Sequence, residues 1–355
     1  MFNDYSMSGK MADSKIFAYV SHAASRNILV FRLDPESGEA TRMQEVPIAG
    51  KVMPLAVSPD RRFLYAALRS QPYSIASFTI DGLSGRLTHL GSAPLPPMTY
   101  ISTDRSGRFL FGASIPENTA KPMASVISVS AIGVHGFVQP PHQIIRTDPM
   151  MHAILPDPSN RYVLATSCDG DLILRQIFDA ATGLFSSNAL PPVRVKPGAG
   201  PRHFVFHPNN RFLYLLNETD ASIYAFGYDA AGGALTELQI VSALPPDFSG
   251  KPYAADVRLT PDGRFLYASE RNSNTLAAFR VDRASGRLAG IGNFPTAQQP
   301  RSIGIDPNGR YLLVAERRSN SITSYAIDRE TGNLSKLKNY PTGNEPSWIE
   351  IVGLP

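Results

Sequence analysis

The chain has 355 residues, of which 43% are hydrophobic and 18% charged, a balance that excludes an intrinsically disordered protein. Its net charge of +4 comes without any block of Lys and Arg, which argues against a nucleic-acid partner. No apolar run approaches the ~18 residues of a membrane-spanning helix, and the single cysteine, Cys168, excludes an internal disulfide framework and fits a reducing compartment.

The first residues and the overall composition set the expected organisation of the chain. Residues 1–14 lack the apolar core of a signal peptide, so we expect a disordered tail and a cytoplasmic protein without a membrane partner. The 30 prolines and 27 glycines are scattered, and no segment has the pattern of a long amphipathic helix. Composition therefore favours a single all-β domain over residues 15–355 with many tight turns.

One hairpin pattern recurs six times from Leu55 onward. Each copy has an apolar run, a turn rich in Pro, Asp, Asn or Gly, and a second apolar run that follows Arg and begins with Phe or Tyr. The copies are LAVSPDRRFLYAAL, ISTDRSGRFLFGAS, AILPDPSNRYVLATS, FVFHPNNRFLYLLN, VRLTPDGRFLYASE and IGIDPNGRYLLVAE. The marker arginines, Arg62 to Arg310, lie 46, 53, 50, 53 and 46 residues apart, which predicts a repeat architecture.

Each hairpin is followed by another strand, a turn that runs from Asp to Gly, and a fourth strand. Four strands in about 50 residues without helices are typical of a β-propeller blade, and a β-solenoid would need shorter repeats. The seventh blade is predicted from both ends of the chain, because residues 348–351 resemble a first strand and residues 16–21 a second strand. The expected fold is thus a seven-bladed β-propeller whose last blade is closed by both termini.

Equivalent positions of the repeats lie at equal depth around the central channel, so each alignment column predicts a ring of residues. The ring at the start of the innermost strands comprises Met53, Thr99, His152, Arg202, Ala255, Arg301 and Ser347. The ring just after the second strands comprises Arg69, Ile115, Cys168, Glu218, Arg271, Arg317 and Ala23. Both rings are expected at the same mouth of the channel, because the paired strands are antiparallel.

Cations dominate these two rings. Five arginines surround one carboxylate, Glu218, and one histidine, His152. Such a cluster repels itself unless an anion offsets it, so the mouth is predicted to bind a small anionic molecule. The alternative is that these arginines form ordinary surface ion pairs. A Ca²⁺ site is not expected, because it would need several converging carboxylates.

His203 and Asp256 follow the first ring by one residue. Successive strand residues alternate between faces, so Arg202 and His203 both reach the channel only through a bulge or a twist. We expect one of the two to be structural. The candidate substrate-binding residues are Arg69, His203, Asp256, Arg301 and Arg317.

The segments GAGPRHFVFHP, YAADVRLTPDGRFLYASER and EPSW, with the IGIDPNGRYLLVAE repeat, resemble the seven-bladed propeller lactonase family over residues 15–352. This family includes the propeller type of 6-phosphogluconolactonase and the fungal carboxymuconate lactonizing enzymes. The resemblance implies catalysis without metal or organic cofactor, by residues that match His152, Arg202, Glu218 and Arg271 here. The segment Cys168–Asp171 is acidic where the bacterial 6-phosphogluconolactonases that it resembles carry basic residues, and a longer insertion begins at Ile115. These departures extend the expected substrates to other sugar or sugar-acid lactones.

The expected function is a cytoplasmic lactonase that hydrolyses a small anionic sugar lactone, such as 6-phospho-D-glucono-1,5-lactone or a related aldonolactone. Glu218 or His152 would activate water, and Arg271 with Arg202 would stabilise the oxyanion. The alternatives are a carboxymuconate-type cycloisomerase and a non-enzymatic propeller that binds another protein. The latter predicts a large exposed apolar patch instead of a charged ring. The sequence leaves open whether the protein is a monomer or a dimer.

Overall fold

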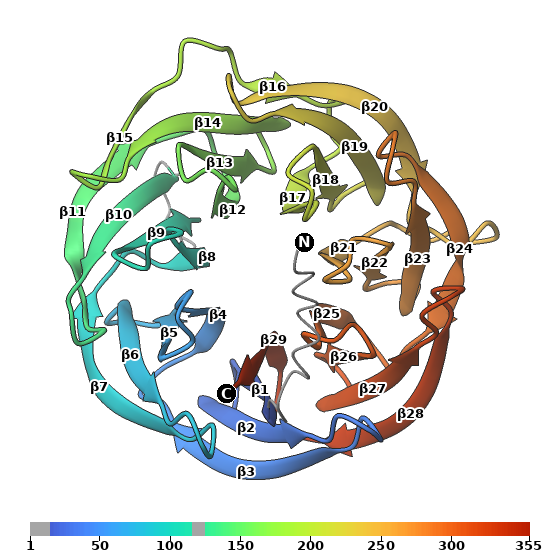
Figure 1. Ribbon diagram of the computed structural model, residues 1–355, viewed down its shortest axis with the longest axis horizontal. Coiled ribbons are helices and arrows are strands. Elements are labelled where there is room, and N and C mark those ends of the chain that lie inside the picture. Colours follow the sequence, from blue (N-terminus) through green and yellow to red (C-terminus); the bar gives the residue numbers. More distant parts are fainter. Residues whose placement is uncertain (1–14, 116–124) are drawn as a thin grey trace, which may run out of the picture.

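The computed structural model describes residues 15–115 and 125–355, and these residues form seven antiparallel sheets around a central channel (Figure 1). The predicted N-terminal tail and the insertion from residue 116 on lie outside the described residues. Within the described part, no helix is long and apolar enough to cross a membrane. The sheets are the predicted propeller blades, and we number them 1 to 7 from β4 onward.

The first three blades run from β4 to β16, and the innermost strand comes first in each. Blade 1 contains β4 (Val52–Val57), β5 (Phe63–Leu68), β6 (Ser74–Ile80) and β7 (Leu87–Pro94). Blade 2 contains β8 (Met98–Thr103), β9 (Phe109–Ser114), β10 (Val126–Ile132) and β11 (Val138–Arg146). Blade 3 contains β12 (Met151–Pro156), β13 (Tyr162–Ser167), β14 (Leu172–Asp179), β15 (Leu184–Ser187) and the additional short strand β16 (Val193–Arg194), which pairs with β14.

The next three blades repeat the same order. Blade 4 contains β17 (Pro201–Phe206), β18 (Phe212–Asn217), β19 (Ser222–Asp229) and β20 (Ala234–Ser242). Blade 5 contains β21 (Ala254–Leu259), β22 (Phe265–Glu270), β23 (Thr275–Val281) and β24 (Leu288–Pro295). Blade 6 contains β25 (Pro300–Ile305), β26 (Tyr311–Glu316), β27 (Ser321–Ile327) and β28 (Leu334–Pro341).

Blade 7 joins the two ends of the chain, as the sequence predicted. Its innermost strand is the C-terminal β29 (Pro346–Leu354), which pairs with β1 (Lys15–His22), followed by β2 (Asn27–Leu33) and β3 (Ala40–Pro47). The pairing runs from Lys15 opposite Leu354 to His22 opposite Pro346. Closure gives β29 a hydrogen-bonded partner and completes the ring between blades 6 and 1 (Figure 1).

The repeated Arg-aromatic pair and the repeated turn glycine explain how neighbouring blades meet. Arg211 lies over the Phe212 ring, with its guanidinium carbon 5.3 Å from the ring centre. Gly286, in the β23–β24 turn of the next blade, packs on the same ring with a φ of +73°. A Cβ on Gly286 would lie 2.4 Å from the Phe212 ring, so only glycine fits this turn. The equivalent glycine of every blade packs on the aromatic residue of the preceding blade: Gly85 on Phe17, Gly136 on Phe63, Gly183 on Phe109, Gly233 on Tyr162, Gly332 on Phe265 and Gly38 on Tyr311.

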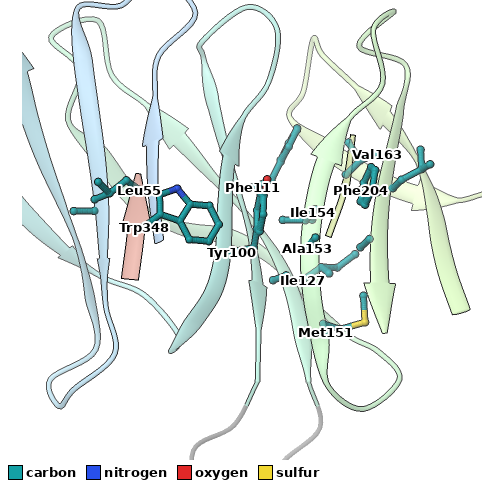
Figure 2. Close-up of a cluster of buried hydrophobic side chains, with 14 of the residues drawn as sticks. Leu55, Tyr100, Phe111, Ile127, Met151, Ala153, Ile154, Val163, Phe204 and Trp348 are labelled. Carbon is teal, nitrogen blue, oxygen red and sulfur yellow. The ribbon is translucent and has the colours of Figure 1, made fainter. Parts of the chain in front are cut away.

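The hydrophobic core lies between the blades as well as within them. One cluster contains Leu55 of blade 1, Phe111 of blade 2, Val163 of blade 3 and Phe204 of blade 4, all buried (Figure 2). Full burial of a side chain of this size contributes roughly 1.5–3 kcal/mol. Each blade therefore depends on its neighbours for stability, and the ring provides a rigid frame for the residues at its mouth.

Candidate active site

β-Bulges carry the first predicted ring of residues into the channel. In all seven innermost strands, the pairing with the second strand shifts register at the predicted position, which is Met53, Thr99, His152, Arg202, Ala255, Arg301 or Ser347. A bulge leaves a residue without a partner in the ladder and redirects its side chain. At Arg202 it lets two consecutive side chains meet, since Arg202 Nη1 lies 3.1 Å from His203 Nε2. The bulge that the sequence analysis required for both side chains to meet is therefore present at Arg202.

The second predicted ring lies at the same mouth. Its members are the residues directly after the second strands, from Arg69 after β5 to Arg317 after β26. The charged members and His152 gather in blades 3 to 6, whereas blades 1, 2 and 7 contribute Met53, Thr99, Ile115 and Ala23 beside Arg69. A symmetric fold thus holds an asymmetric site. Cys168 of this ring is buried, and burial raises its thiol pKa, so it is not a nucleophile in this structure.

Glu218 and two arginines form a clamp at the centre of this cluster. Glu218 Oε2 accepts hydrogen bonds from Arg202 Nε at 2.6 Å and from Arg271 Nη2 at 2.9 Å. Both guanidinium groups are 2% exposed, and the carboxylate is 13% exposed. Burial pushes the pKa of Glu218 up, but the charges of Arg202 and Arg271 outweigh it, so the net shift is downward. Glu218 is therefore an ionised carboxylate at neutral pH.

Backbone carbonyls orient both guanidinium groups. Arg202 Nη1 donates to Ala255 O, and Arg271 donates to Tyr253 O at 2.9 Å and Ala254 O at 2.8 Å. The Arg271 guanidinium also lies 3.2 Å from the centre of the Tyr253 ring. These contacts use several N–H groups of each arginine and leave Arg202 Nη2 and Arg271 Nη1 without an acceptor among the described residues. Two donors are thus available to a negatively charged atom of a substrate.

His203 and Asp256 lie behind Arg202. His203 Nδ1 lies 2.8 Å from Asp256 Oδ1, and since the carboxylate is an acceptor, this nitrogen carries the proton. Nε2 is then free to accept a hydrogen bond from Arg202. Asp256 also accepts from the Ile303 amide at 3.0 Å and from Ser302 Oγ at 3.2 Å. Burial, together with the Arg202 charge, lowers the pKa of His203 to about 3, so the ring is neutral.

His152 lies beside this dyad. Its ring centre is 5.1 Å from that of His203, with the two rings nearly edge to face. Burial lowers its pKa well below the usual range, and the charges of Arg202, Arg301 and Arg271 act in the same direction. Nδ1 is buried without a hydrogen-bond partner. The neutral ring therefore has lone-pair capacity for a proton at neutral pH, although its low pKa makes it a weak base.

Arg301 and Arg317 extend the cluster into blade 6. Arg317 Nη2 pairs with Glu345 at 2.8 Å, whereas the Arg301 side chain has no hydrogen bond to a described residue. Arg69 directly follows β5 in blade 1, at the same mouth of the channel. The contacts and charges described above link His152, Arg202, His203, Glu218, Asp256, Arg271, Arg301 and Arg317 in one cluster.

Sequence reasoning missed the aromatic floor of the channel. The Tyr100 ring lies 5.1 Å from that of His203 and 5.0 Å from that of Trp348, and Trp348 is 5.6 Å from His203. Each of these residues follows its first-ring residue by one position. A third column through the repeats would have found Tyr100 and Trp348 together with His203 and Asp256. Among the described residues, no group of three or more His, Cys, Asp or Glu side chains is placed to hold a metal ion.

Comparisons with known proteins agree with this geometry. The family model described as lactonase, 7-bladed beta-propeller, matches residues 16–351. Proteins named 6-phosphogluconolactonase from Yersinia pseudotuberculosis and Pectobacterium carotovorum are both 39% identical over 290 residues, or 81% of this chain and 83% and 84% of theirs. The periplasmic gluconolactonase of Pseudomonas aeruginosa has a TM-score of 0.89 at 26% identity and covers 96% of this chain and 100% of its own. A putative 6-phosphogluconolactonase of Bacteroides fragilis has a TM-score of 0.86 at 28% identity and covers 96% and 99%. The chain therefore belongs to the seven-bladed β-propeller lactonase family.

Proposed function

We propose that this lactonase hydrolyses 6-phospho-D-glucono-1,5-lactone or a closely related aldonolactone, without a metal or organic cofactor. The names of the most similar relatives support the substrate class. The single observation that carries the proposal is the clamp of Glu218 between Arg202 and Arg271, which combines an ionised carboxylate with two unused donors. Ester hydrolysis needs a proton acceptor for water and donors for the developing oxyanion, and this clamp has both.

In the proposed reaction, water adds to the lactone carbonyl and the ring C–O bond then breaks. Glu218 Oε2 is occupied by both guanidinium groups, so Oε1 is the atom that would take the proton from water, either directly or through His152. Arg202 Nη2 and Arg271 Nη1 would donate to the oxyanion of the tetrahedral intermediate. The proton then passes to the departing ring oxygen, which becomes the C5 hydroxyl of the sugar acid.

His203 and Asp256 have a positioning role in this proposal instead of touching the substrate. Both are buried, and their hydrogen bonds run from Asp256 through His203 to Arg202. This series of hydrogen bonds determines which N–H groups of Arg202 remain available to the substrate. A protonated His203 would lose its acceptor and repel Arg202, so the low pKa of His203 is part of the arrangement.

The experiment is a hydrolysis assay at constant pH on purified protein, with correction for spontaneous lactone opening. Substrates are 6-phosphogluconolactone, glucono-1,5-lactone and a carboxymuconate lactone, each with and without EDTA. We expect EDTA-resistant hydrolysis of at least one aldonolactone. Activity that is lost with EDTA and restored by a divalent cation would contradict the cofactor-free mechanism. Turnover confined to the carboxymuconate lactone would favour the cycloisomerase instead.

The proposed partner is the small anionic lactone alone, and neither nucleic acid nor membrane has a part in the reaction. We propose the cytoplasm as the compartment, since phosphorylated sugar lactones would arise there. The similar structure from Pseudomonas aeruginosa is named a periplasmic gluconolactonase, so the periplasm is the alternative compartment. Fractionation of the source cells with an antibody to the chain decides between the two compartments.

A further inference from the structure

Arg202 and Arg301 occupy equivalent positions in blades 4 and 6 and share the same local geometry. Each follows a proline that is preceded by a residue with positive φ, namely Gly200 at +75° and Gln299 at +63°. Each is also the residue left out of the ladder by the bulge of its innermost strand. The backbone therefore places the two arginines at equivalent positions of the channel mouth.

The residue next to each of these arginines differs in charge between the two blades. In blade 4, the residue after the second strand is Glu218, which pairs with Arg202. In blade 6, the equivalent residue after β26 is Arg317, a second cation. Arg317 is held by Glu345, and its Nε is buried without a partner. Arg301 is thus the arginine of the cluster for which no carboxylate partner is present among the described residues.

The charge balance of the cluster has a deficit of two negative charges. Arg202, Arg271, Arg301 and Arg317 act on one another, and Glu218 and Glu345 are the carboxylates that pair with members of the group. Burial lowers the pKa of Arg301 well below its usual range, and the other three arginines act in the same direction. Arg301 is half-buried, and a partly desolvated guanidinium without an acceptor is costly. A phosphomonoester, which carries about −1.5 to −2 at neutral pH, matches this deficit, whereas a neutral lactone leaves it unfilled.

The surface beside Arg317 has space for such a group. A hollow of about 350 Å³ is lined by Gln299, Arg317, Arg318, Asn320 and Glu345. A second hollow of about 200 Å³ lies between Arg271 and Arg318 and shares Gln299 with the first. Both hollows border the turn that leads into Arg301. The blade 6 side of the mouth is therefore open, polar and basic next to the clamp.

We propose that Arg301 and Arg317 form a subsite for the phosphate of a phosphorylated sugar lactone, while its carbonyl lies against Glu218, Arg202 and Arg271. The inference rests on the proposed lactonase function and adds the orientation of the substrate across the mouth. Arg301 then determines specificity for phosphorylated over neutral lactones, and the phosphate supplies the acceptors that the protein does not.

The acidic segment of blade 3 does not oppose a phosphate here. Asp171 accepts hydrogen bonds from the Gly198 and Gly200 amides at 2.7 and 3.0 Å. It therefore shapes the turn that presents Pro201 and Arg202. Asp169 is exposed on the same loop, in blade 3, whereas the proposed subsite is in blade 6.

The test compares 6-phosphogluconolactone with glucono-1,5-lactone for the wild type and for Arg301→Gln. Loss of a charge-assisted contact predicts that kcat/KM for the phosphorylated lactone falls by about 10- to 100-fold. The value for the neutral lactone should change by less than about threefold, because that substrate makes no contact at the subsite. Arg317→Gln should show the same selective loss, which keeps the test valid if Arg301→Gln folds poorly.

Arg283→Gln is the matched control, since Arg283 is exposed in the β23–β24 turn away from the mouth. It should leave both substrates unaffected. An equal loss on both lactones in Arg301→Gln would assign Arg301 to the catalytic centre and overturn the phosphate subsite. So would a wild type that does not prefer the phosphorylated lactone.

Calorimetric binding of the two sugar acids separates failure of this inference from failure of the proposed function. Wild-type protein should bind 6-phosphogluconate at least about tenfold more tightly than gluconate, and Arg301→Gln should lose this difference. If no lactone is hydrolysed but this difference is found, the proposed function is wrong and the subsite stands. If lactones are hydrolysed and the difference is absent, the subsite is wrong and the lactonase stands.

Discussion

Glu218 is the residue on which the proposed chemistry depends most. Its carboxylate is held by two arginines, so Glu218→Gln should keep the volume and the fold of the site but remove the proton acceptor. We expect kcat to fall by about 10²- to 10⁴-fold with little change in substrate binding, the range for loss of a general base. The measurement is steady-state hydrolysis of the preferred lactone by purified, folded variant.

His152→Ala is the companion variant that assigns the base. If His152 takes the proton and Glu218 orients it, the loss in His152→Ala should exceed that in Glu218→Gln. If Glu218 only neutralises Arg202 and Arg271, its replacement should lower thermal stability and leave kcat near the wild-type value. That last result would remove Glu218 from the mechanism.

The sequence predicted the members of the charged cluster but not their depth. Counting from the marker arginines places His152, Arg202, Glu218 and Arg271 in two rings, because the repeat fixes distance along the chain from a known point of each blade. The position of a residue along its repeat does not predict which hydrogen bonds it makes with the neighbouring blade. The contacts of Arg202 with Ala255 O and of Asp256 with Ile303 N each cross from one blade to the next, so their partners appear only in three dimensions.

At the scale of the strand, the innermost elements depart from regular alternation where function needs it. All seven shift register near their first residues, so the bulge belongs to the scaffold and not to the active site alone. At Met53 the bulged residue is apolar, and in blade 5 the bulge spans Ala255 and the buried Asp256 that pairs with His203. At Arg202 and Arg301, the same irregularity presents a guanidinium to the channel. The site therefore depends on a bulge that is present in the innermost strand of every blade.

The joint between blades gives a prediction at the same scale. Gly286→Ala should lower the free energy of unfolding by about 2 kcal/mol or more, because alanine is strained at a φ of +73° and its Cβ would meet the Phe212 ring. Urea unfolding measures the loss. Gly290→Ala in β24 of the same blade is the control, since no atom lies within 4 Å of its added Cβ. Equal unfolding midpoints for the two variants would contradict the proposed joint.

Over the whole molecule, a ring of similar blades carries a site confined to part of its circumference. The blade-to-blade contacts recur in all seven joints, so the scaffold tolerates different residues in each position of the two rings. Closure by β29 brings Trp348, from the last residues of the chain, against Tyr100 of blade 2 and His203 of blade 4. The floor of the site is therefore complete only when the ring is closed, which couples the stability of the fold to the geometry of the clamp.

Buried histidines in several blades predict how the stability of the whole molecule changes in acid. His22, His152 and His203 are buried in blades 7, 3 and 4, and burial lowers their pKa values, to about 4 for His22 and about 3 for His203. In the unfolded chain each has a pKa of about 6.5, so below that pH the unfolded state binds protons that the folded state does not. Stability from these groups is present above pH ~6.5 and is lost as the pH falls toward their folded values, by up to about 1.4 kcal/mol per pH unit for each histidine.

Glu350 and Asp306 oppose this loss, because burial raises the pKa of each carboxyl group and the folded state therefore gains these protons before the unfolded state does. The three histidines act against these carboxyl groups, and so does His207, which is also buried and has a pKa lowered by burial. We therefore expect the urea midpoint, followed by fluorescence of Trp348, to fall steadily between about pH 6.5 and 5. His22→Gln should flatten this slope by removing one of the three groups, whereas His89→Gln, at an exposed position on β7, should leave the slope unchanged. A midpoint independent of pH over this window would mean that the three histidines are hydrated or charged in the folded protein, and the neutral His203 that orients Arg202 would then have to be abandoned.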